Sequence, residues 1–106
     1  MRMWNVNPKF LCNKHLLGEH VEMHMYVGCI LKRTSLKGYI DKGLVEVHNI
    51  RQRHDELVQE MISRKINHKS ELKNFNSWIE GNVDGTNSIK ELCKRCKNCK
   101  ERIYKK

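Results

Sequence analysis

Apolar residues recur at every third or fourth position along most of this chain, and that period constrains the fold more than any other feature. The first such stripe contains Leu16, His20, Met23, Val27 and Ile30. Steps of four and three residues place side chains on one face of an α-helix. The strict alternation of apolar and polar residues that is typical of a half-buried strand does not occur. We therefore expect a small all-α protein.

Two long helices are expected first. One covers residues 13–32, with Asn13 as its N-cap. The second ends near Lys65, and its stripe contains Val47, Ile50, His54, Leu57 and Met61. The turn-rich segment KRTSLKGYIDKG between them is predicted to be a loop.

Two shorter helices are expected in the rest of the chain. Ser70 would cap a third helix with Leu72, Phe75, Trp78 and Ile79 as its apolar residues. The run Ser88-x-x-Glu91 has the form of a capping box and would open a last helix. The inner side of that helix would carry Ile89, Leu92, Cys96, Cys99 and Ile103. The prediction is a compact bundle of three to four helices, with residues 1–106 forming a single domain.

The net charge of the chain is +9, which favours a polyanionic partner and makes nucleic acid the preferred one. Residues 90–106 contain eight Lys or Arg against two Glu, so this segment carries six of the nine excess charges. Lys94, Arg95 and Lys97 are therefore candidate phosphate contacts. No apolar run reaches the length of a membrane span or signal peptide, so an intracellular protein without a membrane partner is expected.

A cluster of histidines in HLLGEHVEMH suggests a metal site at first sight. Zinc peptidases place a glutamate directly after the first histidine, whereas here the order is His20-Val21-Glu22-Met23-His24. Glu22 would therefore point away from the helix face that His20 and His24 share. The two histidines could bind a metal, but no third ligand is apparent, so no metal site is predicted.

The five cysteines are an odd number and are expected to stay reduced. Cys93, Cys96 and Cys99 would lie on one continuous helix, from which three thiolates cannot converge on a tetrahedral ion. Cys12 and Cys29 show no matching spacing. Packing as small apolar residues is the preferred interpretation, and a cysteine–zinc nucleic-acid module is the alternative.

A polar stripe on the first helix is the best candidate for chemistry. Its members, His15, Glu19, Glu22 and Tyr26, are spaced by four, three and four residues. Carboxylates one turn apart repel each other, which favours protonation of one of them and suits proton transfer. A solvated helix face is the ordinary alternative.

Several runs along the chain occur in a familiar order. Met1-Arg2 is followed by Lys14-His15-Leu16-Leu17 and then by Glu22 and Gly28. Further on come Arg51-Gln52-Arg53, Glu56-Leu57 and Arg64-Lys65-Ile66-Asn67-His68. Together these runs resemble the phage endonuclease V family of pyrimidine-dimer DNA glycosylases, and MRMWNVNPKF is similar to the opening of its bacterial members. The resemblance covers about residues 1–70.

The resemblance implies an all-helical DNA glycosylase with abasic-site (AP) lyase activity that needs no metal and no cofactor. In this family the N-terminal α-amine is the nucleophile and a glutamate on the first helix is the acid–base group. These roles would fall to Met1 and Glu22. Arg2 and His15 would position the damaged sugar and its phosphate, and Arg51 and Arg53 would contact DNA. The expected partner is damaged double-stranded DNA, bound by a monomer inside the cell, or inside the host cell if a phage encodes it.

The implied chemistry agrees with the residues present. An α-amine is less basic than a lysine amine, so a useful fraction is neutral at pH 7 and can form a Schiff base with deoxyribose. Arg2 is too large for normal removal of the initiator methionine, so Met1 is expected to be retained and deformylated. The phage prototype has arginines beside its glutamate where this chain has Val21 and Met25. A basic DNA-binding protein without catalysis is therefore the alternative function.

Overall fold

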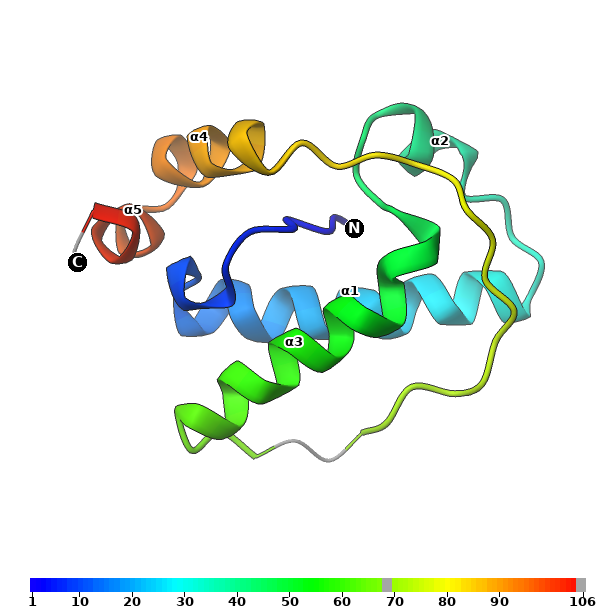
Figure 1. Cartoon of the computed structure of the whole chain (residues 1–106), viewed down its shortest axis with the longest axis horizontal. Helices are drawn as coiled ribbons and strands as arrows, with labels where there is room; N and C mark the ends of the chain where they lie inside the picture. Colours follow the sequence, from blue (N-terminus) through cyan, green and yellow to red (C-terminus); the bar gives the residue numbers. More distant parts are fainter. Residues whose placement is uncertain (68–69, 105–106) are drawn as a thin grey trace.

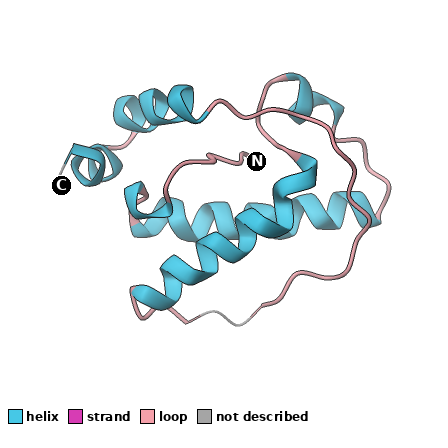
Figure 2. Cartoon of the chain, viewed as in Figure 1, coloured by secondary structure: helices cyan, strands magenta, loops and turns pink. Residues whose placement is uncertain are grey.

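Helices provide the regular structure of the protein, and the described part of the chain contains no strand (Figure 2). A computed structural model describes residues 1–67 and 70–104, so His68, Lys105 and Lys106 lie outside it. The elements are η1 (Pro8–Phe10), α1 (Asn13–Leu31), α2 (Lys37–Asp41), η2 (Val47–Asn49), α3 (Ile50–Ser63), α4 (Gly85–Arg95) and α5 (Lys97–Tyr104). The predicted small all-α fold is confirmed. None of these helices is both long enough and apolar enough to cross a membrane.

The core forms where α1 and α3 cross and press their apolar stripes together (Figure 1). Both predicted stripes face this contact, and their fully buried members include Leu16 and Met23 of α1 and Ile50 and Leu57 of α3. Burial of each such side chain contributes about 1.5–3 kcal/mol to the stability of the fold. The two long helices are therefore held together by the residues whose spacing predicted them.

The N-terminal segment is not helical and runs through the middle of the molecule, alongside α1 (Figure 1). Met3 and Trp4 are buried, and the Met3 N–H donates to the Leu44 carbonyl at 2.7 Å. The Trp4 N–H donates to the Glu19 carboxylate at 3.1 Å. The first residues of the chain are thus fixed against the middle of α1.

The helix predicted after Ser70 is wrong, because residues 70–84 form an extended segment along the edge of the molecule (Figure 1). The backbone of this segment bonds to the η2 region instead of to itself. Val47 N–H donates to the Glu80 carbonyl at 3.0 Å, and Val83 N–H donates to Glu46 at 2.8 Å. Ile79 remains 88% exposed, so a helix here would gain little from its apolar spacing.

The last predicted helix is in fact two helices. Its N-cap is Asp84, whose side chain accepts from the N–H groups of Thr86 and Asn87, whereas Ser88 is buried within the helix. At Cys96 the backbone turns extended (φ −134°, ψ 110°), and this break separates α4 from α5. The expectation that Cys96 and Cys99 lie on one continuous helix is therefore wrong.

Two smaller boundaries also differ from the prediction. Cys12, not Asn13, is the N-cap of α1, and the Asn13 side chain instead accepts a hydrogen bond from Arg64 at 3.0 Å. The segment predicted as a loop contains the short helix α2.

Candidate active site

A pocket of about 510 Å³ opens where the N-terminal segment lies against α1. This volume is within the range of about 300–1,000 Å³ that is usual for small-molecule sites. Met1 and Arg2 line it from the N-terminal segment, His15 and Glu22 from α1, and Arg95 from α4. Three parts of the chain therefore meet at one cavity.

The central contact in this pocket joins the beginning of the chain to Glu22. The Arg2 N–H donates to the Glu22 Oε1 at 2.8 Å, across twenty residues of sequence. Because Arg2 follows Met1 directly, this hydrogen bond holds the first residue of the chain beside the Glu22 carboxylate. Met1 and Glu22, predicted as nucleophile and acid–base group, thus line the same pocket.

The Arg2 side chain lies over the Trp4 ring, with its Cζ 4.1 Å from the ring centroid. Burial lowers the pKa of Arg2, nearby Glu91 opposes this shift, and Arg95 adds to it. A guanidinium with a lowered pKa still carries its charge at neutral pH. Arg2 and Arg95 therefore present two cations at one pocket, an arrangement suited to a phosphate.

His15 has two neighbourhoods. Its ring lines the pocket and meets the Trp4 ring edge-on at 5.9 Å, while its Nδ1 lies 3.2 Å from the Cys12 Sγ. Burial and the charge of Lys14 lower the pKa of His15, and Glu22 only partly opposes them. The imidazole is therefore neutral at pH 7.

The other two members of the predicted polar stripe have structural roles. Glu19 is 1% exposed and holds Arg53 in a two-pronged ion pair at 2.6 and 2.9 Å. The Tyr26 hydroxyl donates to the Leu44 carbonyl at 3.1 Å. Burial, with the charge of Glu22, raises the pKa of Tyr26, so its phenol stays protonated at neutral pH. The solvated face considered as an alternative does not describe Glu19 or Tyr26.

Comparison with protein families bears directly on this pocket. The sequence profile of the pyrimidine dimer DNA glycosylases matches residues 1–74. The chain belongs to the pyrimidine dimer DNA glycosylase family. No curated protein and no solved structure gives a significant match.

Membership of the pyrimidine dimer DNA glycosylase family confirms the resemblance drawn from the sequence and implies DNA as the substrate. The matched region includes Met1, Arg2, His15 and Glu22, whereas Arg95 reaches the same pocket from beyond it. The pocket of this glycosylase is thus completed by a helix that the family profile does not cover.

The remaining predicted DNA contacts are not gathered at the glycosylase pocket. Arg51 is exposed on α3, donates to the Lys73 carbonyl at 3.2 Å and borders a different pocket. Arg53 points into the interior and is 2% exposed, so its guanidinium is not presented to a ligand at the surface. Lys94 and Lys97 are exposed on either side of the break at Cys96.

Three further residues line the pocket and were not predicted, namely Trp4, Lys14 and Leu44. Lys14 stands in the same short run as His15, which was a usable signal. Leu44 arrives through the backbone contact with Met3, which no sequence spacing announces.

Proposed function

We propose that the protein is a DNA glycosylase with AP lyase activity that acts on ultraviolet-induced pyrimidine dimers or a related lesion. The α-amine of Met1 is the nucleophile, and Glu22 is the acid–base group. The observation that carries the proposal is the 2.8 Å hydrogen bond from the Arg2 N–H to Glu22, beside Met1 in one pocket.

The reaction begins with the neutral amine, whose lone pair attacks C1′ of the damaged nucleotide. The bond to the base breaks and its electron pair leaves with the base, which is then protonated. Loss of a proton from the amine and opening of the sugar ring give a Schiff base. Glu22 stabilises the positive charge that develops on the sugar and transfers these protons. Removal of a C2′ proton then expels the 3′ phosphate and cuts the strand.

Charge and shape around the pocket support this sequence of steps. Arg2 and Arg95 would bind a phosphate flanking the damaged sugar, and neutral His15 would help to position the sugar. The damaged nucleotide must leave the base stack, which costs a few kcal/mol. Backbone contacts from the exposed Lys94 and Lys97 would offset that cost.

Borohydride trapping on duplex DNA with one abasic site tests the nucleophile. Reduction of the Schiff base should link the protein covalently to DNA, and peptide mapping should locate the link at the Met1 amine. Acetylation of that amine should abolish the adduct. A wild-type protein that yields no adduct, or an adduct mapped to a lysine, contradicts the proposal.

The Glu22→Gln substitution tests the acid–base group. It should reduce strand cleavage by at least about a hundredfold, because acid–base groups typically contribute about 10²–10⁴-fold. DNA binding should persist. The matched control is Glu71→Gln, an exposed carboxylate outside the pocket, which should cleave at the wild-type rate. Equal activity in both variants would remove Glu22 from the mechanism.

A DNA-binding protein without catalysis is the second candidate. It is favoured by the residues beside Glu22, because Val21 and Met25 are 54% and 49% exposed and carry no charge where the phage prototype has arginines. This candidate predicts DNA binding with no trapped adduct, so the trapping experiment separates the two functions.

A further inference from the structure

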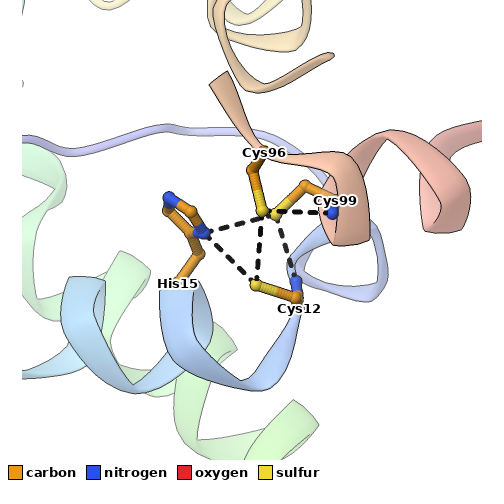
Figure 3. Close-up of side chains that lie close together, drawn as sticks. All are labelled: Cys12, His15, Cys96 and Cys99. Carbon is orange, nitrogen blue, oxygen red and sulfur yellow. Dashed lines mark hydrogen bonds between the residues drawn. The ribbon is translucent and has the colours of Figure 1, made fainter. Parts of the chain in front are cut away.

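Four potential metal ligands converge at a position where the beginning and the end of the chain meet. The side chains of Cys12, His15, Cys96 and Cys99 point toward one another (Figure 3). The three sulfurs and the His15 Nδ1 all lie within 4.8 Å of one another. The Cys12 Sγ is 3.8 Å from the Cys96 Sγ, and the Nδ1 is 3.2 Å from the Cys12 Sγ and 3.5 Å from the Cys99 Sγ.

Local structure explains this convergence. Cys12 is the N-cap of α1 and His15 lies in its first turn, while Cys96 is the break before α5 and Cys99 lies in the first turn of that helix. Each pair thus has two residues between its members and sits where a helix begins. This is the spacing with which zinc sites take two ligands from a tight turn.

We propose that these four side chains bind one Zn²⁺ ion in a closed, structural Cys₃His site. Zn–S bonds of about 2.3 Å and Zn–N bonds of about 2.0–2.1 Å form a tetrahedron whose edges are about 3.8 Å between sulfurs and about 3.6 Å between sulfur and nitrogen. The three distances above match these edges within about 0.4 Å. Three thiolates and one imidazole in a tetrahedron select zinc over magnesium or calcium, which prefer oxygen ligands.

The surroundings suit a zinc–thiolate centre. The Cys12 N–H donates to the Cys99 Sγ at 3.3 Å, and the Cys99 N–H donates to the Cys96 Sγ at 3.4 Å. Backbone donors of this kind stabilise thiolate charge around a metal. A Zn²⁺ ion with three thiolates carries a net charge of −1, and the basic α4–α5 segment compensates it.

Two other arrangements of these cysteines predict different products. Packing as apolar residues accounts for the burial of Cys99, but it gives no reason for an imidazole nitrogen among three sulfurs. A disulfide between Cys12 and Cys96 would use two sulfurs and leave Cys99 and His15 without a function. The zinc site uses all four groups.

A second cluster, formed by His20, His24 and His54, is a weaker candidate. The His54 ring supplies the third nitrogen near His20 and His24 that the sequence did not reveal. However, the three rings pack against one another with centroids 4.9–5.0 Å apart, and the His54 Nδ1 contacts Asp55 at 3.0 Å. Packing and hydrogen bonding account for these rings without a metal.

The zinc site is also a fastening between the family-matched part of the chain and the helices beyond it. Cys12 and His15 lie within residues 1–74, whereas Cys96 and Cys99 lie outside them. Arg95 precedes the ligand Cys96 directly, so the metal would hold this arginine at the pocket. It would also fix the His15 ring in the pocket wall.

Metal content tests the proposal without any measurement of DNA cleavage. The full-length protein, purified under reducing conditions with zinc and then dialysed, should contain one zinc ion per chain by elemental analysis and native mass spectrometry. Cys96→Ser should lose that ion. The matched control is Cys93→Ser, one helical turn earlier on α4 and outside the cluster, which should retain it.

The outcomes separate the alternatives. Wild-type protein without zinc overturns the proposal, and a mass lower by two hydrogens would assign the cysteines to a disulfide. Zinc retained in Cys96→Ser also overturns it, and its loss in His24→Gln would move the metal to the histidine cluster. If Cys96→Ser does not fold, cobalt substitution of the wild type decides. The bands of tetrahedral cobalt with thiolate ligands support the site, and their absence excludes it.

Discussion

Arg53 is the largest of the fully buried side chains, and its charge is neutralised where it lies. Glu19 pairs with it through both oxygens, and the Val6 carbonyl accepts a further hydrogen bond at 2.6 Å. Burial alone would lower the pKa of Arg53, but the hydrogen bonds and charge of Glu19 outweigh burial and raise it. The pair therefore joins α1, α3 and the N-terminal segment that carries Met1 and Arg2.

Arg53→Met should destabilise the protein by about 3–5 kcal/mol, because it leaves the Glu19 carboxylate buried without its cation. Arg51→Met, on the same helix but exposed, should cost less than about 1 kcal/mol. Urea unfolding followed by circular dichroism measures both. Similar losses in the two variants would show that the buried pair has no special role.

At the scale of elements, the end of α3 is tied to the chain before α1. Glu60 of α3 accepts from Arg64 at 2.8 Å and pairs with Lys9 at 3.4 Å. Arg64 also donates to the Pro8 carbonyl at 3.2 Å. Burial alone would raise the pKa of Glu60, but Arg64 and Lys9 outweigh it and hold this pKa below its usual value.

This shift predicts how stability depends on pH. A carboxyl whose pKa is lower in the folded state stabilises the fold above its unfolded pKa, near about 4.3, and this contribution is lost as the pH falls through the folded pKa. Wild-type protein should therefore exceed Glu60→Gln in stability at pH 7, by about 1 kcal/mol. The difference should shrink steadily in acid. Thermal melts between neutral pH and pH 3 measure this, and a constant difference would contradict it.

The extended segment of residues 70–84 depends on one glycine. Gly81 has φ +95°, and a Cβ at this position would lie only 2.1 Å from the Val45 carbonyl oxygen. Gly81→Ala should therefore cost more than about 2 kcal/mol, from backbone strain and displacement of the segment.

The matched control for that substitution is Gly28→Ala, in the interior of α1, where an added Cβ meets no atom within 4 Å. It should be neutral or stabilise the helix by about 0.5–1 kcal/mol. Guanidinium unfolding curves give both values, and a Gly81→Ala protein as stable as the wild type would show that the segment can move aside.

Periodicity predicted α1 and α3 because their apolar stripes are buried against each other. It failed for residues 70–84 because Trp78 and Ile79 occur at helical spacing but remain largely exposed. It also missed the break at Cys96, where neither proline nor glycine interrupts the sequence. The matching two-residue gaps in Cys12-x-x-His15 and Cys96-x-x-Cys99 were visible, but nothing in the chain showed that these two turns meet.

At the scale of the whole molecule, the candidate site joins what the resemblance assigned with what the fold adds. Glu22 and the beginning of the chain were expected together, and they share a hydrogen bond. Arg95 was expected on a basic surface, and its place in the pocket follows only from the path of α4. Arg53 carries a charge typical of DNA contacts, but burial beside Glu19 is a tertiary fact that charge counting does not reveal.

The surplus of positive charge predicts salt-sensitive binding to DNA. A Lys94→Gln/Lys97→Gln variant should bind duplex DNA more weakly, and the slope of log affinity against log salt should fall by about 0.9 for each lysine that neutralises a phosphate in the wild type. Lys37→Gln, which removes an exposed lysine already paired with Asp41, should leave the slope unchanged. Fluorescence anisotropy over a range of salt concentrations measures these slopes, and equal slopes in all three proteins would exclude α4–α5 from the interface.

The extended segment also bears on where a minimal fragment can end. The family match stops at residue 74, which lies within this segment and before Val83 and Gly81 reach their partners in the η2 region. A fragment cut there would leave Glu46 without the Val83 N–H and would lack Arg95 from the pocket. The boundary of recognisable ancestry is thus not a boundary of folding, and a shortened version of this enzyme would have to keep the two helices that lie beyond the family match.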